Sequence, residues 1–196
     1  MSPSGGTVML RTPPYLPSFQ FHEAHELTCA GNPQQLLQAI LTQNLRQDPL
    51  IGFFMALRER VPGIFLRRKP PQNTAAAPNP FGLDNFTRLE TTPTHMTLGL
   101  VGRFWRPTFG LYPIADLSAF KAFNTPGIAK LVLTFEVEPA PKHTVKLATQ
   151  TWVYCPDTAT RFKMQLYWAL IRPASGLIRR RILALAAKQA RTTRPL

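Results

Sequence analysis

The sequence is poor in acidic side chains, cysteines and long apolar runs. Ten Asp and Glu residues oppose 23 Lys and Arg residues, which gives a formal net charge of +13. No apolar run approaches the roughly 18 residues that span a bilayer. The first 18 residues contain prolines and one arginine but no apolar core of signal-peptide length. We therefore expect a cytoplasmic protein in which Cys29 and Cys155 are reduced, partly buried thiols.

Catalytic and metal-binding motifs are also missing. The sequence contains no P-loop, GxSxG or HExxH motif, and its four histidines lack metal-ligand spacing. We therefore expect no cofactor and no metal, and we assign no catalytic residue. His25 shares the strand parity of Phe21 and Leu27 and can face a cavity. A histidine that is hydrogen-bonded within the protein or exposed to solvent is, however, more common than one that acts as a catalytic base. The acids nearly all fall at predicted outward or loop positions: Glu23, Glu26, Asp84, Glu90, Asp116, Glu136 and Glu138.

Positive charge is abundant and clustered. One cluster lies at 67–69, and a second runs from Arg172 to Arg194. Its candidate anion-binding residues are Arg179, Arg180, Arg181 and Lys188. Such a surface attracts RNA, acidic proteins or anionic membranes, and a merely solvated face is the simpler alternative. The basic run lacks the interleaved aromatic residues typical of single-strand binding, which weakens the nucleic-acid hypothesis.

The composition predicts one domain. Residues 1–18 are rich in Pro, Gly and Ser and are expected to be flexible, and residues 19–190 form a single domain. The segment 69–85 has the proline and small polar content of a mobile loop. Residues 191–196 form a basic tail.

Hydrophobic periodicity predicts the elements. A strand over 19–30 precedes two short helices, the first opened by Asn32-Pro33 and the second running from Asp48-Pro49 to Pro62-Gly63. Strands follow over 86–92, 95–105, 130–138 and 144–155, with a short helix over 115–123 before the third of them. Each strand alternates between an apolar and a polar face, as in an antiparallel sheet covered on one side.

The last predicted element is a long helix capped by Asp157 or Thr158. Its apolar residues recur at helical spacing, and Pro173 with Gly176 is expected to kink or interrupt it. Successive strands followed by such a helix predict an α+β fold, in which a curved antiparallel sheet closes around the helix.

This order of elements resembles the helix-grip fold of the START-like (SRPBCC) superfamily, and most closely a group of uncharacterised bacterial SRPBCC proteins. The similar segments are 48–63, 94–107, 120–135 and 167–183, with the words Gly102-Arg103-Phe104-Trp105 and Ile171-Arg172-Pro173. One departure is Gln150-Thr151-Trp152, where such relatives tend to carry Glu-Thr-Arg.

The resemblance implies a cavity between sheet and helix that binds a hydrophobic small molecule, lipid- or polyketide-like. The apolar candidates for its lining are Met96, Leu98, Leu100, Phe104, Leu133, Phe135, Phe162, Leu166 and Leu170. Thr149 and Thr151 place hydroxyls on the inward face, and Arg172 can hold an acidic head group or extend to solvent. The alternatives are a basic module that binds an anionic partner and a cyclase- or hydrolase-type enzyme.

Overall fold

The structure is a computed structural model that describes residues 15–42, 85–106, 109–141 and 144–192. Along the chain the elements are β1 (Phe21–Cys29), α1 (Pro33–Thr42), β2 (Thr87–Thr91), β3 (His95–Gly102), α3 (Leu117–Ala122), β4 (Ala129–Ala140), β5 (Thr144–Tyr154) and α4 (Thr158–Thr192). The predicted helix between Asp48 and Gly63, the basic cluster at 67–69 and nearly all of the predicted loop 69–85 lie outside these residues.

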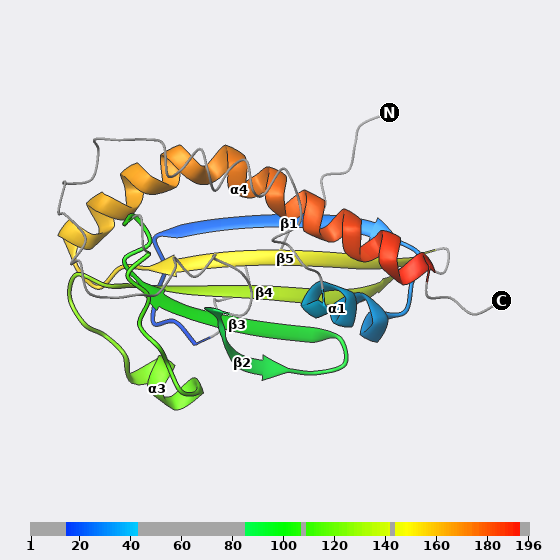
Figure 1. The fold of residues 1–196 in the computed structure, drawn as a ribbon, viewed down its shortest axis with the longest axis horizontal. Coiled ribbons are helices and arrows are strands. Elements are labelled where there is room, and N and C mark those ends of the chain that lie inside the picture. The colour runs from blue at the N-terminus through cyan, green and yellow to red at the C-terminus, as the bar shows by residue number, and fades with distance from the viewer. Residues whose placement is uncertain (1–14, 43–84, 107–108, 142–143, 193–196) are drawn as a thin grey trace, which may run out of the picture.

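The five strands form one open antiparallel sheet in the order β1-β5-β4-β3-β2. The first strand therefore lies beside the last (Figure 1), paired from Phe21 opposite Val153 to Cys29 opposite Val145. The fold is α+β, with an open antiparallel sheet followed by a long helix, as the order of elements predicts.

Local side-chain hydrogen bonds set the starts of the helices. Asn32 Oδ1 accepts hydrogen bonds from the backbone N–H groups of Gln34 (2.9 Å) and Gln35 (3.3 Å), so it caps α1 as predicted. Asp157 Oδ1 accepts from the backbone N–H of Thr160 at 2.8 Å and caps α4. Its Oδ2 accepts from the Thr160 hydroxyl (2.6 Å) and from the Gly127 N–H (2.7 Å), which ties the helix to the turn before β4.

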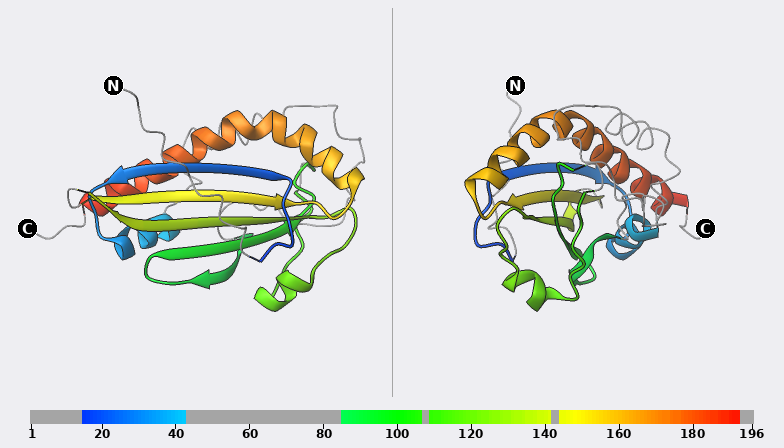
Figure 2. Two further views of the ribbon diagram at one scale, coloured as in Figure 1. Left: turned by 180° about the vertical axis from the view of Figure 1, so that it is seen from behind. Right: turned by 60° about the vertical axis from the view of Figure 1, so that its left-hand side comes forward.

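The two faces of the sheet are covered unequally, and Figure 2 shows the short helix α3 at one end of the sheet. α1 and α4 pack on the face that carries Met96, Leu133 and Leu147, which we call the helix-facing side. α3 packs on the other face, which we call the opposite side. A buried apolar cluster there contains Leu16, Leu89, Val101, Phe120, Ile128, Val132 and Trp152.

The prediction of a sheet covered on one side is therefore wrong for one part of the opposite side, whereas Glu26 and Glu138 on that side are exposed as predicted. Alternation shows which residues share a face, but it does not show whether a face is solvated. Lys130, Gln150 and Trp152 were expected to face outward, and they lie on the opposite side yet are buried. Leu16 is buried in the same layer, so the packed part of the chain begins before residue 19.

Two local predictions also fail. β3 ends at Gly102, and Trp105 packs beside Phe104 in a cluster with helix α4 rather than on the other face. α4 continues through Pro173 and Gly176 as one helix, so of the predicted kink or interruption at these residues the interruption is wrong. Figure 1 shows this helix as a curved ribbon that arches along the sheet.

Candidate functional site

Four polar side chains gather beneath α4 on the helix-facing side. Period-two alternation along β1 places Glu23 and His25 on this face, with the apolar residues Phe21 and Leu27 before and after them. In the register of β1 and β5, Glu23 lies opposite Thr151 and His25 lies opposite Thr149. We call these four residues the polar band.

The polar band contains one close contact and several unpartnered atoms. His25 Nε2 lies 2.8 Å from Glu23 Oε1, and the two side chains are only 13% and 8% exposed. Among the described residues, Glu23 Oε2 and the hydroxyls of Thr149 and Thr151 are buried with no hydrogen-bond partner. Each such atom costs about 1–3 kcal/mol when nothing compensates for its lost hydration.

Helix α4 closely approaches the polar band at Gly176. A Cβ atom at this position would lie 3.1 Å from Glu23 Oε1 and 3.4 Å from His25 Cε1. Glycine therefore allows the helix backbone to lie against the Glu23–His25 pair, and even an alanine there would require the pair to shift by a few tenths of an ångström.

Apolar clusters flank the polar band on both sides along the sheet. One cluster joins Leu100, Phe104 and Val153 to the first half of α4, and the other joins Met96, Leu98 and Leu147 to its second half. The carboxylate accepts hydrogen bonds, the hydroxyls donate and accept, and the imidazole can do both. Such a group can orient the polar end of an apolar molecule, and the Glu23–His25 pair can hold a proton between two bases.

The predicted sheet residues lie where the sequence placed them. Buried on the helix-facing side are Met96, Leu98, Leu100, Phe104, Leu133, Phe135, Thr149 and Thr151. The predicted helix residues do not join them, because Phe162, Leu166 and Leu170 are 61%, 45% and 47% exposed. Arg172 is exposed as well.

That error has a physical cause. In the first half of α4, the buried residues that pack on the sheet are Met164, Tyr167 and Trp168, which also recur at helical spacing. α4 therefore has two apolar faces, and periodicity alone does not show which of them is inward.

Glu23 was missed as an inward-facing acid. It was grouped with the outward and loop carboxylates, yet its parity matches that of Phe21, His25 and Leu27. The alternation that placed His25 on an inward face applies equally to Glu23, so the signal was present in the sequence. His22 points to the other face, where its Nε2 lies 3.1 Å from Gln150 Oε1 and its ring stacks on Trp152.

The predicted anion-binding residues Arg180, Arg181 and Lys188 are exposed on the second half of α4. The side chain of Arg179 lies outside the described residues. Cys29 and Cys155 form no disulfide, in line with the predicted reduced thiols, and both are buried rather than partly buried. Burial raises the pKa of the Cys155 thiol to about 12, which keeps it protonated and unreactive at neutral pH.

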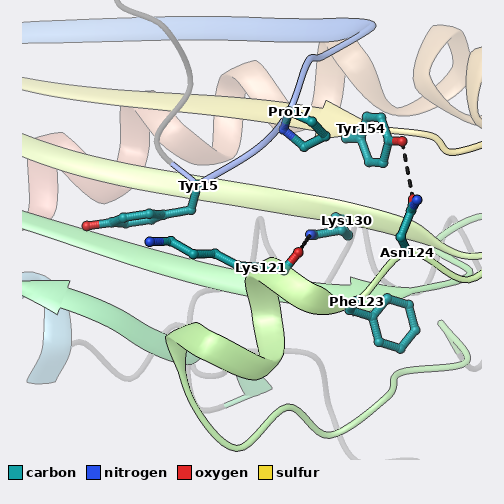
Figure 3. Close-up of a pocket in the computed structure, with 7 residues that line it drawn as sticks. All are labelled: Tyr15, Pro17, Lys121, Phe123, Asn124, Lys130 and Tyr154. Carbon is teal, nitrogen blue, oxygen red and sulfur yellow. Dashed lines mark hydrogen bonds between the residues drawn. The ribbon is translucent and has the colours of Figure 1, made fainter.

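A hollow of about 390 Å³ lies on the opposite side of the sheet. Figure 3 shows its seven lining residues, which come from the segment before β1, from α3 and the turn after it, and from β4 and β5: Tyr15, Pro17, Lys121, Phe123, Asn124, Lys130 and Tyr154. The Tyr154 hydroxyl donates to Asn124 Oδ1 at 3.2 Å. Lys121 Nζ lies 5.0 Å from the centre of the Tyr15 ring.

Lys130 gives this hollow its unusual character. The side chain is 2% exposed, its Nζ donates to the Lys121 carbonyl at 3.2 Å, and the ammonium lies 4.7 Å from the centre of the Phe120 ring. Burial lowers the pKa of Lys130. The hollow is thus a second candidate site, suited to a small anion, but its polar side chains have partners, whereas three oxygen atoms of the polar band lack them.

Within the described ranges, no three His, Cys, Asp or Glu side chains gather as a metal site. No helix in that part of the chain is long and apolar enough to cross a membrane. Comparison of the sequence with protein-family models and with curated proteins gives no match to either.

Proposed function

We propose that the protein binds an apolar small molecule, lipid- or polyketide-like, between the sheet and α4. The polar end of the molecule would lie at the polar band, and its apolar body would lie among the clusters beside it. This would make the protein a START-like, helix-grip binding protein of the kind that its sequence resembles. The observation that carries the proposal is the set of three buried oxygens without partners at Glu23, Thr149 and Thr151.

Energetics support a ligand at this position. Three unpartnered oxygens, at about 1–3 kcal/mol each, are a large fraction of the stability of one domain. A ligand carrying a hydroxyl, carbonyl or carboxylic acid group would supply the missing hydrogen bonds. Sites for small molecules are mostly apolar with a few placed polar groups, and the polar band between two apolar clusters has that composition.

The open antiparallel sheet with a long helix along one face is compatible with the helix-grip fold. Gly176 adds a specific feature, because the helix backbone itself rests beside the polar band. Because this backbone fills the space over the Glu23–His25 pair, a ligand would reach the polar band there only if α4 moved away from the sheet.

Native mass spectrometry of gently purified protein tests the proposal. We expect a co-purified molecule that chloroform extraction releases. The double variant Thr149→Val/Thr151→Val keeps the side-chain shape and removes both hydroxyls. We therefore expect the amount of co-purified molecule to fall at least about tenfold relative to wild type. The matched control is Thr134→Val, because Thr134 is equally buried with an unpartnered hydroxyl but lies on the opposite side.

Three outcomes are decisive. Ligand-free protein, together with no uptake of fatty acids or polyketide aglycones, would overturn the proposal. Equal ligand content in the double variant and in wild type would show that the polar band does not bind the ligand. Conversion of the bound molecule to a product of different mass, abolished by Glu23→Gln, would assign catalysis to the Glu23–His25 pair instead of simple binding.

A further inference from the structure

The outer face of α4 carries an apolar stripe that the sheet does not cover. Phe162, Leu166, Leu170 and Leu177 are 45% to 61% exposed. Their spacings of 4, 4 and 7 residues place them in one row along the helix. This row lies away from Met164, Tyr167 and Trp168, which pack on the sheet.

The same row becomes basic toward the C-terminus. Arg181 follows Leu177 by 4 residues, and Lys188 follows Arg181 by 7, so both continue the stripe, and both are exposed. Two further exposed basic side chains, Lys163 and Arg180, lie beside the row, three residues from Leu166 and Leu177. The helix contains no Asp or Glu in its 35 residues.

We propose that this outer face of α4, the stripe with its basic neighbours, docks on an anionic lipid surface. A helix that lies in the membrane interface combines exposed Leu and Phe side chains with Lys and Arg, and no acidic side chain on α4 opposes anionic head groups. The exposed leucines would enter the acyl boundary, while the basic side chains would contact phosphate groups.

The side-chain composition of the stripe favours lipid over nucleic acid. Single-stranded RNA binds where aromatic side chains stack on successive bases, and the stripe contains one aromatic residue, Phe162, among three leucines. Burying aliphatic side chains gains free energy in lipid, whereas a nucleic-acid backbone offers them no apolar partner. The proposal is independent of the molecule proposed beneath the helix, because the stripe and the polar band lie on different faces of α4.

Flotation with lipid vesicles tests the proposal on the full-length protein. We expect binding to phosphatidylglycerol vesicles, little binding to phosphatidylcholine vesicles, and a steep loss of binding with added salt. Phe162→Ser/Leu166→Gln should weaken binding at least about tenfold, because two apolar side chains no longer enter the lipid. The control is Phe19→Ser, since Phe19 is 37% exposed but lies before β1.

A second pair of variants separates charge from apolar burial. Lys163→Gln/Arg180→Gln should weaken binding to phosphatidylglycerol vesicles about thirtyfold, since each basic side chain near the surface contributes about 1 kcal/mol. Arg88→Gln, at an exposed position on β2, should leave binding unchanged. All these positions are exposed, so circular dichroism and the thermal midpoint should match those of wild type.

Several results would overturn the proposal. Binding to neither vesicle would do so, as would equal binding to both. Binding to single-stranded RNA that competes with vesicles and is unaffected by Phe162→Ser/Leu166→Gln would assign the basic face to nucleic acid.

Discussion

The two sides of the sheet both bury polar groups, and they do so differently. On the helix-facing side, these groups form one contiguous band on β1 and β5, and three of their oxygens lack partners. On the opposite side they are spread over the sheet and most contact a neighbour, as His22 does with Gln150 and His95 with Thr97. Strand β5 supplies both patterns from alternate residues.

This difference shows what distinguishes a candidate site from a polar interior. A buried polar atom alone is a common structural feature, and Thr134 and Trp152 each leave one unpartnered on the opposite side. Several such atoms in adjacent positions, beside a helix backbone, are less easily explained by packing. The polar band is therefore the stronger candidate, and the opposite side is its natural control.

The largest expected effect tests whether the apolar clusters on both sides of the sheet stabilise the fold. Phe120→Ala on the opposite side and Phe135→Ala on the helix-facing side should each lower the free energy of unfolding by about 3–5 kcal/mol, because both side chains are almost completely buried. Urea denaturation measures both values. A loss below about 1 kcal/mol for Phe120→Ala would mean that α3 covers the sheet only loosely.

An intermediate effect compares the helices of the two sides through their caps. Asp157→Ala should lower the free energy of unfolding by about 1–2 kcal/mol, and Asp116→Ala by less. Asp157 accepts hydrogen bonds from Thr160 and Gly127, whereas Asp116 accepts one from the Ala119 N–H at 2.8 Å. Thermal unfolding of both variants measures the difference.

The Asp157 effect should also depend on pH. The Thr160 hydroxyl first, and then the backbone N–H groups of Gly127 and Thr160, lower the pKa of Asp157 from 3.8 to about 2. Because the folded pKa lies below the unfolded value, the stabilisation is present above about pH 4 and is lost as the pH falls toward 2. Wild type and Asp157→Ala should therefore converge in acid, and a constant gap down to pH 2 would contradict this assignment.

The smallest effect concerns the hollow on the opposite side. Lys130→Met should raise the free energy of unfolding near neutral pH by about 1 kcal/mol, because it removes a buried ammonium. Lys121→Met changes an exposed lysine and should have no effect.

The pH dependence identifies the lysine responsible. Burial lowers the pKa of Lys130 from 10.5, so between the folded and unfolded pKa values the unfolded chain binds more protons. Wild-type stability should rise with pH through that window, relative to Lys130→Met, and stay level below it. Chemical denaturation across alkaline pH measures how the free energy of unfolding depends on pH. Parallel curves for wild type and Lys130→Met would show that Lys130 does not cause the rise.

Alternation and capping signals predicted most of the fold. The strands and the caps at Asn32 and Asp157 follow from local side-chain chemistry, so the sequence contains them directly. The pairing of β1 with β5 and the second apolar layer at Phe120 depend on contacts between distant segments, which no local pattern encodes.

Only part of the candidate site was predicted from the sequence. Thr149 and Thr151 were recognised because hydroxyls are conspicuous on an apolar face, and Glu23 was missed because carboxylates are usually exposed. Phe162 was placed inward because a helix with two apolar faces gives the same periodicity in either orientation. Strand parity assigns faces reliably, whereas helix periodicity needs the packing partner as well.

The pairing of β1 with β5 has a consequence for the order in which the protein folds. His22 and Gln150 are 128 positions apart, so β1 emerges from the ribosome long before the strand that pairs with it. Bringing such distant segments together carries a loop-closure entropy that local hairpins avoid, and contacts of this kind slow folding. We expect the meander from β2 to β5 to assemble first and β1 to dock afterwards. The Glu23–His25 pair would then meet Thr149 and Thr151 only in this final step. A chain in which β1 has not yet docked would therefore lack the polar band.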